Sequence, residues 1–172
     1  MTPEACEIRF LVDSTAARLS RWLRFLGYDA VLDKTDSDAK LLARARREGR
    51  VLLTRKRALG TGSRAGVAVP GGAMPGAMLL SSDFVSEQLE QVARAFGLTQ
   101  RPMARCTLCN SELSLVSRAE ADGRVPERVY QSRSEFAYCP HCDKYYWKGT
   151  HWEHAGKTAA AVVSRRQKRR RS

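Results

Sequence analysis

The first hundred residues alternate between short apolar runs and longer amphipathic stretches. Four apolar runs have the length and composition of buried strands, at 8–12, 29–32, 50–54 and 77–80. Three amphipathic stretches alternate with them and repeat their apolar residues at helical spacing, at 14–27, 36–49 and 83–97. This alternation predicts an α/β domain in which parallel strands are joined by right-handed helical crossovers.

The helical stretches carry boundary signals. Ser14 or Thr15 is expected to cap the first helix, and Asp36 or Ser37 the second, because short polar side chains accept hydrogen bonds from the first turn. The first two stretches end in a glycine, Gly27 and Gly49, as is typical of a helix end. We therefore expect well-defined helices on the faces of the sheet.

The third helix has the clearest apolar stripe. The spacing predicts that Phe84, Leu89, Val92 and Phe96 face the core, with Asp83 as the cap. Between the third strand and the fourth, residues 60–77 hold six of the twelve glycines and are expected to form a loop with one short strand, "GVAV". This loop lacks the Gly-Lys-Ser or Gly-Lys-Thr ending of a phosphate-binding loop.

The charge of the chain indicates which class of partner it binds. The apolar fraction of 43% is enough for a core, and the net charge is +12. No run of about 18 apolar residues and no signal-peptide pattern is apparent, so we expect a cytoplasmic protein that does not enter a membrane. The tail at 156–172 ends in "SRRQKRRRS", which suits a nucleic acid; a disordered, merely solubilising tail is the alternative.

Two cysteine pairs dominate the second half of the chain. Cys106 and Cys109 form "CTLC", and after 29 residues Cys139 and Cys142 form "CPHC". Four thiolates at this spacing predict a tetrahedral, structural Zn²⁺ site. Two disulfides or four free thiols are the alternatives, and a cytoplasmic location disfavours disulfides. We therefore expect a small β zinc ribbon over 101–155.

Acids follow two of the predicted strands. Asp13 comes directly after the first, and Asp33, Asp36 and Asp38 follow the second. The carboxyl ends of parallel strands form the ligand crevice of such a sheet, where acids can hold Mg²⁺ or Mn²⁺ for phosphodiester hydrolysis. The alternative is that Asp36 only caps a helix and Asp33 only shapes a turn.

These segments resemble the Mut-seven C-terminal RNase domain family. The likeness rests on "RFLVDSTAARLSRWLRFLGYDA", "REGRVLLTRKRAL" and "YWKGTHW", and it spans roughly residues 8–155. It implies a PIN-like α/β domain over 1–100, fused to the zinc ribbon, and an RNA substrate. On the family pattern, Asp13 and either Asp36 or Asp38 correspond to active-site acids.

One position departs from the family pattern. The third strand of the family usually ends "LTRDR", but here it ends "LTRKR", so Lys56 replaces an acid. One hypothesis is a Mg²⁺- or Mn²⁺-dependent ribonuclease with Asp13, Asp36 and Asp38 as catalytic residues. The other is a catalytically lapsed RNA-binding protein that associates with tRNA or the ribosome. A ribbon that only binds protein fits the cysteines but not the charge.

The residues expected to contact RNA lie in three parts of the chain. Arginines of the first helix match the family pattern, the "RKR" triplet follows the third strand, and the remainder are rings and cations near the C-terminus. The full set is Arg18, Arg21, Arg55, Lys56, Arg57, His151, Trp152, Arg165, Arg166, Lys168, Arg169, Arg170 and Arg171.

Overall fold

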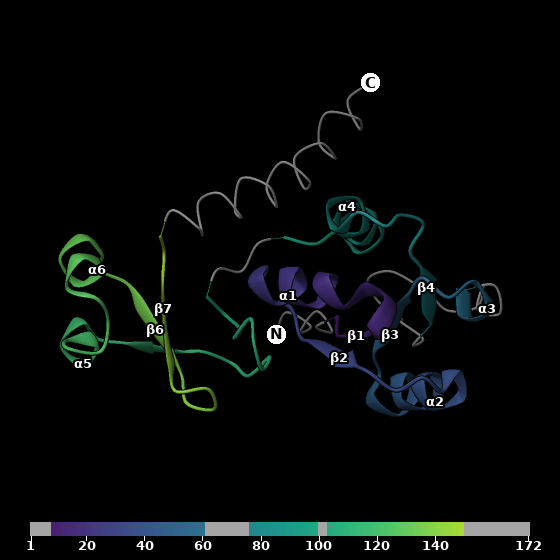
Figure 1. Ribbon diagram of the computed structural model, residues 1–172, viewed down its shortest axis with the longest axis horizontal. Coiled ribbons are helices and arrows are strands. Elements are labelled where there is room, and N and C mark those ends of the chain that lie inside the picture. Colours follow the sequence, from purple (N-terminus) through teal and green to yellow (C-terminus); the bar gives the residue numbers. More distant parts are fainter. Residues whose placement is uncertain (1–7, 61–75, 100–102, 150–172) are drawn as a thin grey trace, which may run out of the picture.

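The computed structural model describes residues 8–60, 76–99 and 103–149 of the chain. They form a four-stranded parallel sheet flanked by helices and a separate three-stranded antiparallel sheet (Figure 1). The expected α/β class and the later β module are both confirmed. In these ranges, no helix is long and apolar enough to cross a bilayer.

The parallel sheet has the strand order β2-β1-β3-β4. Its strands are β1 Phe10–Asp13, β2 Ala30–Asp33, β3 Val51–Thr54 and β4 Ala77–Leu79. The central strands β1 and β3 are buried along their whole length, which explains why their sequences are apolar without alternation. All four predicted strands are therefore confirmed, whereas the expected "GVAV" strand lies outside the described residues.

Helices cover both faces of the parallel sheet. They are η1 Ser14–Ala16, α1 Ala17–Phe25, α2 Asp38–Glu48, α3 Arg57–Gly60 and α4 Val85–Phe96. The helices α1 and α4 lie on one face and α2 on the other (Figure 1). Alternate residues of β1 divide accordingly: Phe10 belongs to the α1–α4 core, and Leu11 belongs to the core with Leu41 of α2.

The helix starts follow the sequence signals only in part. Ser37 caps α2, and Gly49 ends that helix in the left-handed conformation with φ +61°. The first helix is instead preceded by η1, where Asp13 accepts a hydrogen bond from the Thr15 N–H at 3.0 Å. The prediction that Ser14 or Thr15 caps the helix is therefore wrong, because Asp13 at the end of β1 takes the capping position.

The start of α4 also differs from the prediction. Phe84 occupies the N-cap position without a side-chain hydrogen bond, and Asp83 pairs with Arg55 instead of capping the helix. Phe84 is 70% exposed, while Leu89 and Phe96 are buried as expected. The backbone at Phe84 is extended, with φ −84° and ψ 123°, so its side chain does not follow the helical period.

The ribbon contains an antiparallel sheet in the order β5-β6-β7. Its strands are β5 Ser114–Val116, β6 Phe136–Cys139 and β7 Lys144–Trp147. Two short helices that the sequence pattern does not indicate lie between β5 and β6, namely α5 Arg118–Ala121 and α6 Glu127–Ser132. They enclose a small core around Phe136, with Ala121 and Val125. A core of this size needs a metal or another staple to be stable.

Asp29, just before β2, joins the two sheets. Arg50 donates hydrogen bonds to both of its carboxylate oxygens, at 2.7 and 3.0 Å. The side-chain Nδ2 of Asn110 in the ribbon donates to the same carboxylate at 2.7 Å. The side-chain Oδ1 of Asn110 accepts from the Ala30 N–H at 3.0 Å. Asp29 and Arg50 are both buried. One carboxylate therefore holds the start of β3 and the ribbon together.

This network shifts the titration of Asp29. Burial by itself raises the pKa of Asp29, but the hydrogen bonds from Arg50 and Asn110 outweigh it and hold the pKa below its ordinary value. The ionised carboxylate therefore adds stability that is present above the unfolded-state pKa of about 3.9 and is lost as the pH falls through the folded-state pKa.

Asp29→Asn is expected to destabilise the protein most at neutral pH. Breaking a fully buried ion pair costs about 3–5 kcal/mol, and this pair is slightly exposed, so we expect a loss of about 2–3 kcal/mol at pH 7. The variant should also lose part of the acid-induced decline in stability below about pH 4. Urea unfolding at several pH values measures both, with exposed Asp122→Asn as the control. An unchanged acid profile in Asp29→Asn would mean that other carboxylates control acid unfolding.

Candidate zinc centre and strand-end site

The four cysteines predicted to bind zinc come together in the structure. Their sulfur atoms lie within 4.8 Å of one another. Cys106 Sγ is 3.9 Å from Cys142 Sγ, and Cys109 Sγ is 3.5 Å from Cys139 Sγ. A tetrahedral site with Zn–S bonds of about 2.3 Å has sulfur–sulfur edges of about 3.8 Å. The donor set therefore fits one Zn²⁺, and none of the four sulfurs is in a disulfide.

The same kind of turn follows both cysteine pairs. Asn110 and Asp143 come directly after the second cysteine of each pair and have positive φ values of 74° and 48°. Asn and Asp adopt this left-handed conformation more readily than most residues. In the first pair the Asn110 N–H donates to the Cys106 carbonyl oxygen at 3.0 Å and closes the turn. The residue after each pair is thus part of the ligand-presenting loop.

The cysteines differ in how readily they ionise. Burial raises the pKa of Cys109, but hydrogen bonds with Ser111 and with the other thiols bring the pKa down to about 6. The pKa of Cys142, by contrast, is raised to about 12, mainly by the hydrogen bond between Cys142 and Cys109. Zinc binding needs all four thiolates and so displaces the remaining protons. The affinity for zinc should therefore decrease as the pH falls.

Arg24 of α1 brings a positive charge to the first cysteine turn. Its guanidinium donates to the carbonyl oxygens of Leu108 at 2.6 Å and Thr107 at 3.3 Å, and its Nε donates to that of Ala30 at 2.8 Å. Burial lowers the pKa of Arg24, and the neighbouring cysteine charges offset this in part. An arginine stays protonated in proteins. Arg24 therefore fastens the turn to α1 and partly balances the thiolate charge.

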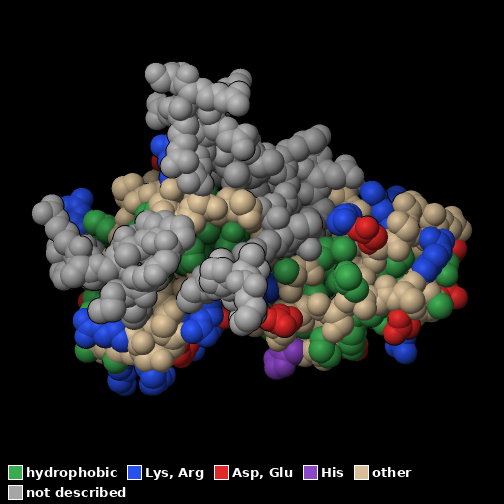
Figure 2. Space-filling model, turned by 180° about the vertical axis from the view of Figure 1, so that it is seen from behind, with side chains coloured by type: hydrophobic (Ala, Val, Ile, Leu, Met, Phe, Trp, Pro, Cys, Tyr) green, Lys and Arg blue, Asp and Glu red, His purple; other side chains and the backbone are tan. Residues whose placement is uncertain are grey.

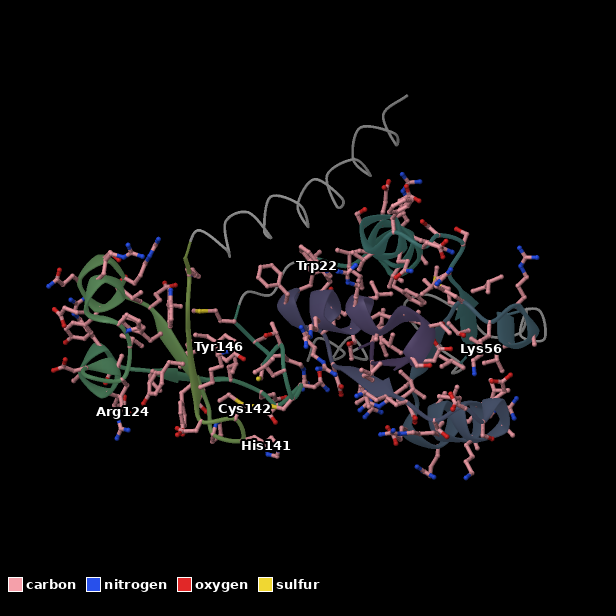
Figure 3. All side chains as sticks on the ribbon, in the orientation of Figure 1. Trp22, Lys56, Arg124, His141, Cys142 and Tyr146 are labelled. Atoms are coloured by element: carbon pink, nitrogen blue, oxygen red, sulfur yellow. The ribbon has the colours of Figure 1, made fainter. Side chains whose placement is uncertain are left out.

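The second candidate site lies at the carboxyl ends of the parallel strands, away from the cysteines. Figure 3 shows Lys56 and Cys142 in opposite halves of the molecule. The carboxylate of Asp13 is fully buried there. One of its oxygens accepts from the Thr15 N–H and hydroxyl, and the other accepts from the Thr54 hydroxyl at 2.6 Å. Asp13 therefore ties the end of β1 to the end of β3.

Lys56 supplies the cation of the strand-end site. Its Nζ donates to Asp38 Oδ1 at 2.8 Å and to the Asp36 carbonyl oxygen at 3.4 Å. The hydrogen bond to Asp38, together with the charges of Asp38, Asp13 and Asp36, raises the pKa of Lys56. The ammonium therefore stays charged at neutral pH and partly balances the acids around it.

The predicted catalytic acids do not assemble a divalent-metal site in this arrangement. Within the described ranges, the four cysteines are the only group of His, Cys, Asp or Glu residues whose ligand atoms lie close enough for one ion. Asp13 is buried and bonded to threonines, and Asp38 is bonded to Lys56. Asp36 is exposed, and the side chain of Asp38 is 42% exposed despite its ion pair. Mg²⁺ needs open carboxylate oxygens and keeps several waters, so these residues do not fit it while Lys56 stays in place.

Four of the predicted RNA contacts are exposed cations. Arg18 and Arg21 are exposed on α1, and Arg55 and Arg57 are exposed on either side of Lys56. Arg55 and Lys56 each form an ion pair with an acid. The predicted contacts outside the described residues are His151, Trp152, Arg165, Arg166, Lys168, Arg169, Arg170 and Arg171.

The "RKR" triplet is therefore less positive than its sequence indicates. Arg55 forms an ion pair with Asp83 before α4, and Lys56 forms one with Asp38 of α2. The expected cationic patch over the crevice is partly neutralised by these pairs. On the face seen in Figure 2, Lys and Arg side chains lie in separate groups, with Asp and Glu among them.

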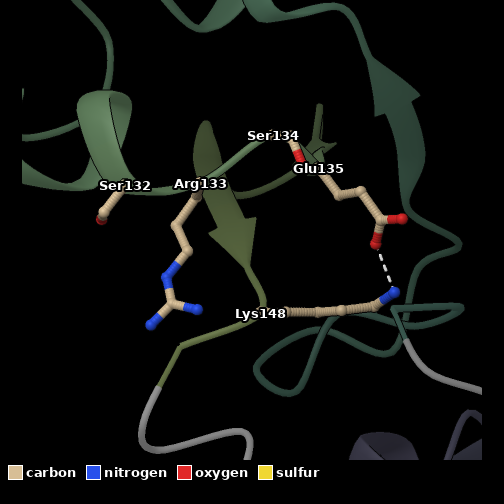
Figure 4. A pocket seen from close by; sticks show the side chains of 5 residues that line it. All are labelled: Ser132, Arg133, Ser134, Glu135 and Lys148. Atoms are coloured by element: carbon tan, nitrogen blue, oxygen red, sulfur yellow. Dashed lines mark ion pairs between the residues drawn. The ribbon is translucent and has the colours of Figure 1, made fainter.

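A hollow of about 340 Å³ lies on the ribbon (Figure 4). Its lining is Ser132, Arg133, Ser134, Glu135 and Lys148. Glu135 forms an ion pair with Lys148 across the opening. One of the two cations is thus neutralised, so the hollow is not a strong site for a phosphate.

Sequence reasoning missed three residues that organise these sites: Arg24, Thr54 and Asn110. A weak signal exists for Thr54, which stands at a strand end next to the "RKR" triplet. Arg24 follows Arg21 at helical spacing and looks like another surface cation. Asn110 directly follows a cysteine pair, but its partners are 80 and 81 residues away. Only the folded chain reveals these contacts.

The described residues thus combine a parallel α/β domain that has acids at its strand ends with a four-cysteine ribbon. A family model described as "Mut7-C RNAse domain" matches residues 8–159. The chain therefore belongs to the Mut7-C RNAse domain family, and the resemblance noted from the sequence is confirmed. No curated protein matches the chain. Family membership indicates a ribonuclease-like or RNA-binding function, with RNA as substrate or partner.

Purified protein is expected to carry about one Zn²⁺ per chain. Cys139→Ser should abolish zinc binding, unfold the ribbon and lower the melting temperature of the parallel domain, because Arg24 and Asp29 of that domain lose their ordered partners in the ribbon. Metal analysis and thermal unfolding measure these effects. Acidification should weaken zinc binding progressively, since protons compete with the metal for the four thiolates.

Cys6→Ser is the matched control, because Cys6 is the one cysteine outside the two pairs. This variant should keep its zinc and its melting temperature. Protein that contains no zinc after careful preparation would contradict the site. A parallel domain that melts unchanged in Cys139→Ser would show that the ribbon docks independently of the metal.

Proposed function

We propose that this protein binds RNA through its ribonuclease-like domain, and that Lys56 takes the electrostatic place of a metal ion. The observation that carries the proposal is the ion pair between Lys56 and Asp38 at the strand ends. Structured RNA such as tRNA or rRNA is the proposed partner. The net charge of +12 and the exposed Arg18 and Arg21 support a polyanionic ligand.

Charge balance at the strand ends supports this proposal. Asp13, Asp36 and Asp38 would repel phosphates if nothing balanced them. A divalent ion balances such acids in metal-dependent nucleases and also activates a water molecule. The ammonium of Lys56 supplies one positive charge but has no water ligand to deprotonate. The site therefore suits phosphate binding better than hydrolysis.

Mg²⁺- or Mn²⁺-dependent RNA hydrolysis is the second candidate. Family membership and the exposed carboxylate of Asp36 favour it. Asp38 is also accessible, since its side chain is 42% exposed, and it would be released if Lys56 moved away. In that case Asp13, Asp36 and Asp38 are the residues that would hold the ion.

Lys56→Asp separates the two candidates. If Lys56 replaces a metal, the wild type should not bind Mn²⁺ at the strand ends, and the variant should bind it through the added carboxylate. The same variant should bind RNA more weakly in metal-free buffer, because a positive charge becomes negative. Calorimetric titration with Mn²⁺ and filter binding of tRNA measure the two effects.

Arg46→Asp is the matched charge reversal, because Arg46 is exposed at the far end of α2. It should leave Mn²⁺ binding unchanged. Cleavage of RNA by the wild type with Mn²⁺, abolished by Asp13→Asn and not improved by Lys56→Asp, would refute the charge-replacement proposal. Circular dichroism should show that Asp13→Asn still folds, because Asp13 also joins two strands.

The basic tail is expected to contribute to affinity by releasing counterions. Deleting residues 164–172 removes six positive charges, so the slope of log affinity against log salt should flatten by up to about 4. A variant of full length with the six cations changed to Gln separates charge from chain length and should behave like the deletion. An unchanged slope in both variants would exclude the tail from the RNA contact.

A further inference from the structure

Phe84 is out of place for an apolar residue. Three large apolar side chains are exposed among the described residues, and Phe84, at 70% exposure, is the only aromatic one. The other two, Leu108 and Leu115, lie in the ribbon. Phe84 also occupies a helix N-cap, where a small polar residue would accept a hydrogen bond. A phenylalanine at this position therefore neither buries its ring nor caps the helix.

The backbone holds Phe84 firmly in this exposed position. Its N–H donates to Ser82 Oγ at 3.0 Å, and its carbonyl oxygen accepts from the N–H groups of Glu87 at 3.1 Å and Gln88 at 3.0 Å. The buried Gln88 side chain donates in turn to the Ser82 carbonyl oxygen at 2.8 Å. The ring is therefore presented to solvent by an ordered segment.

The segment that carries Phe84 is connected to the strand-end site. The neighbouring Asp83 forms the ion pair with Arg55, the residue that directly follows β3. The Arg55 N–H donates at 3.0 Å to the Thr15 hydroxyl, which also contacts Asp13. A chain of direct contacts therefore connects the segment that carries Phe84 to the buried acid of the site.

We propose that Phe84 is a base-stacking residue at the rim of the strand-end site, where it receives an unpaired base of the bound RNA. The proposal rests on the RNA-binding function proposed above. Bases in a duplex already stack on one another, whereas an unpaired base offers its face to an aromatic ring. The cation linked to this segment is Arg55, through its ion pair with Asp83, and Lys56 and Arg57 follow Arg55 directly in the chain, so we expect the triplet to contact the adjoining phosphates. The ligand is thus a single-stranded stretch, such as a loop of a structured RNA.

The test compares Phe84→Leu with Phe84→Trp. Leucine keeps an apolar side chain but removes the π face, so affinity for a single-stranded RNA oligonucleotide should fall about tenfold. The salt slope should not change, because no charge is altered. Tryptophan should restore the affinity. Fluorescence of 2-aminopurine in the oligonucleotide should be quenched by the wild type and Phe84→Trp, and not by Phe84→Leu.

Leu115→Ala is the control for an exposed apolar side chain elsewhere, since Leu115 is 77% exposed on β5. It should bind the oligonucleotide like the wild type. Equal affinity of Phe84→Leu and wild type, or an equal loss on fully paired duplex RNA, would overturn the stacking role while leaving RNA binding intact. A wild type that binds no RNA would instead overturn the proposed function together with this inference. Loss of self-association in Phe84→Leu, with RNA affinity unchanged, would assign the ring to a protein contact.

Discussion

The buried carboxylate of Asp29 is the contact on which the arrangement of the two sheets depends. A buried charge is costly unless its hydrogen bonds are made. Here the partners come from Arg50 before β3 and Asn110 in the ribbon. The carboxylate is therefore satisfied only when both parts of the chain are in place. Because Asn110 follows a cysteine pair, we expect zinc binding to be coupled to the packing of the ribbon against the parallel domain.

The helix α1 links this joint to the proposed RNA surface. Arg24, near its C-terminal end, is buried against the first cysteine turn, whereas Arg18 and Arg21 face solvent. A change in the zinc site thus acts on the same helix that presents two candidate RNA contacts. This gives a physical reason for combining a nuclease-like domain with a ribbon: the ribbon holds helix α1 in a defined position against the sheet.

At the carboxyl ends of the parallel strands, charge again restricts which residues can lie together. Acids at parallel strand ends need a cation, and in this chain Lys56 supplies it through Asp38. A lysine is covalently tethered and has no water ligand to deprotonate, so it can balance the acids without generating a nucleophile. Under the proposed function, RNA binding at this site is therefore separated from hydrolysis. Phe84 fits the same interpretation, since stacking adds affinity for unpaired RNA without any chemistry at phosphorus.

The sequence by itself determined the strands, the main helices, the metal-ligand set and the acids at the strand ends. These features are local: apolar periodicity, glycine stops and Cys-x-x-Cys spacing act within a few residues. Only the tertiary structure decided that Arg24 is buried, that Phe84 is exposed and that Lys56 pairs with Asp38. The reason is that burial and partner choice depend on residues far apart in sequence, such as Asp29 and Asn110, 81 residues apart, which the topology brings into contact.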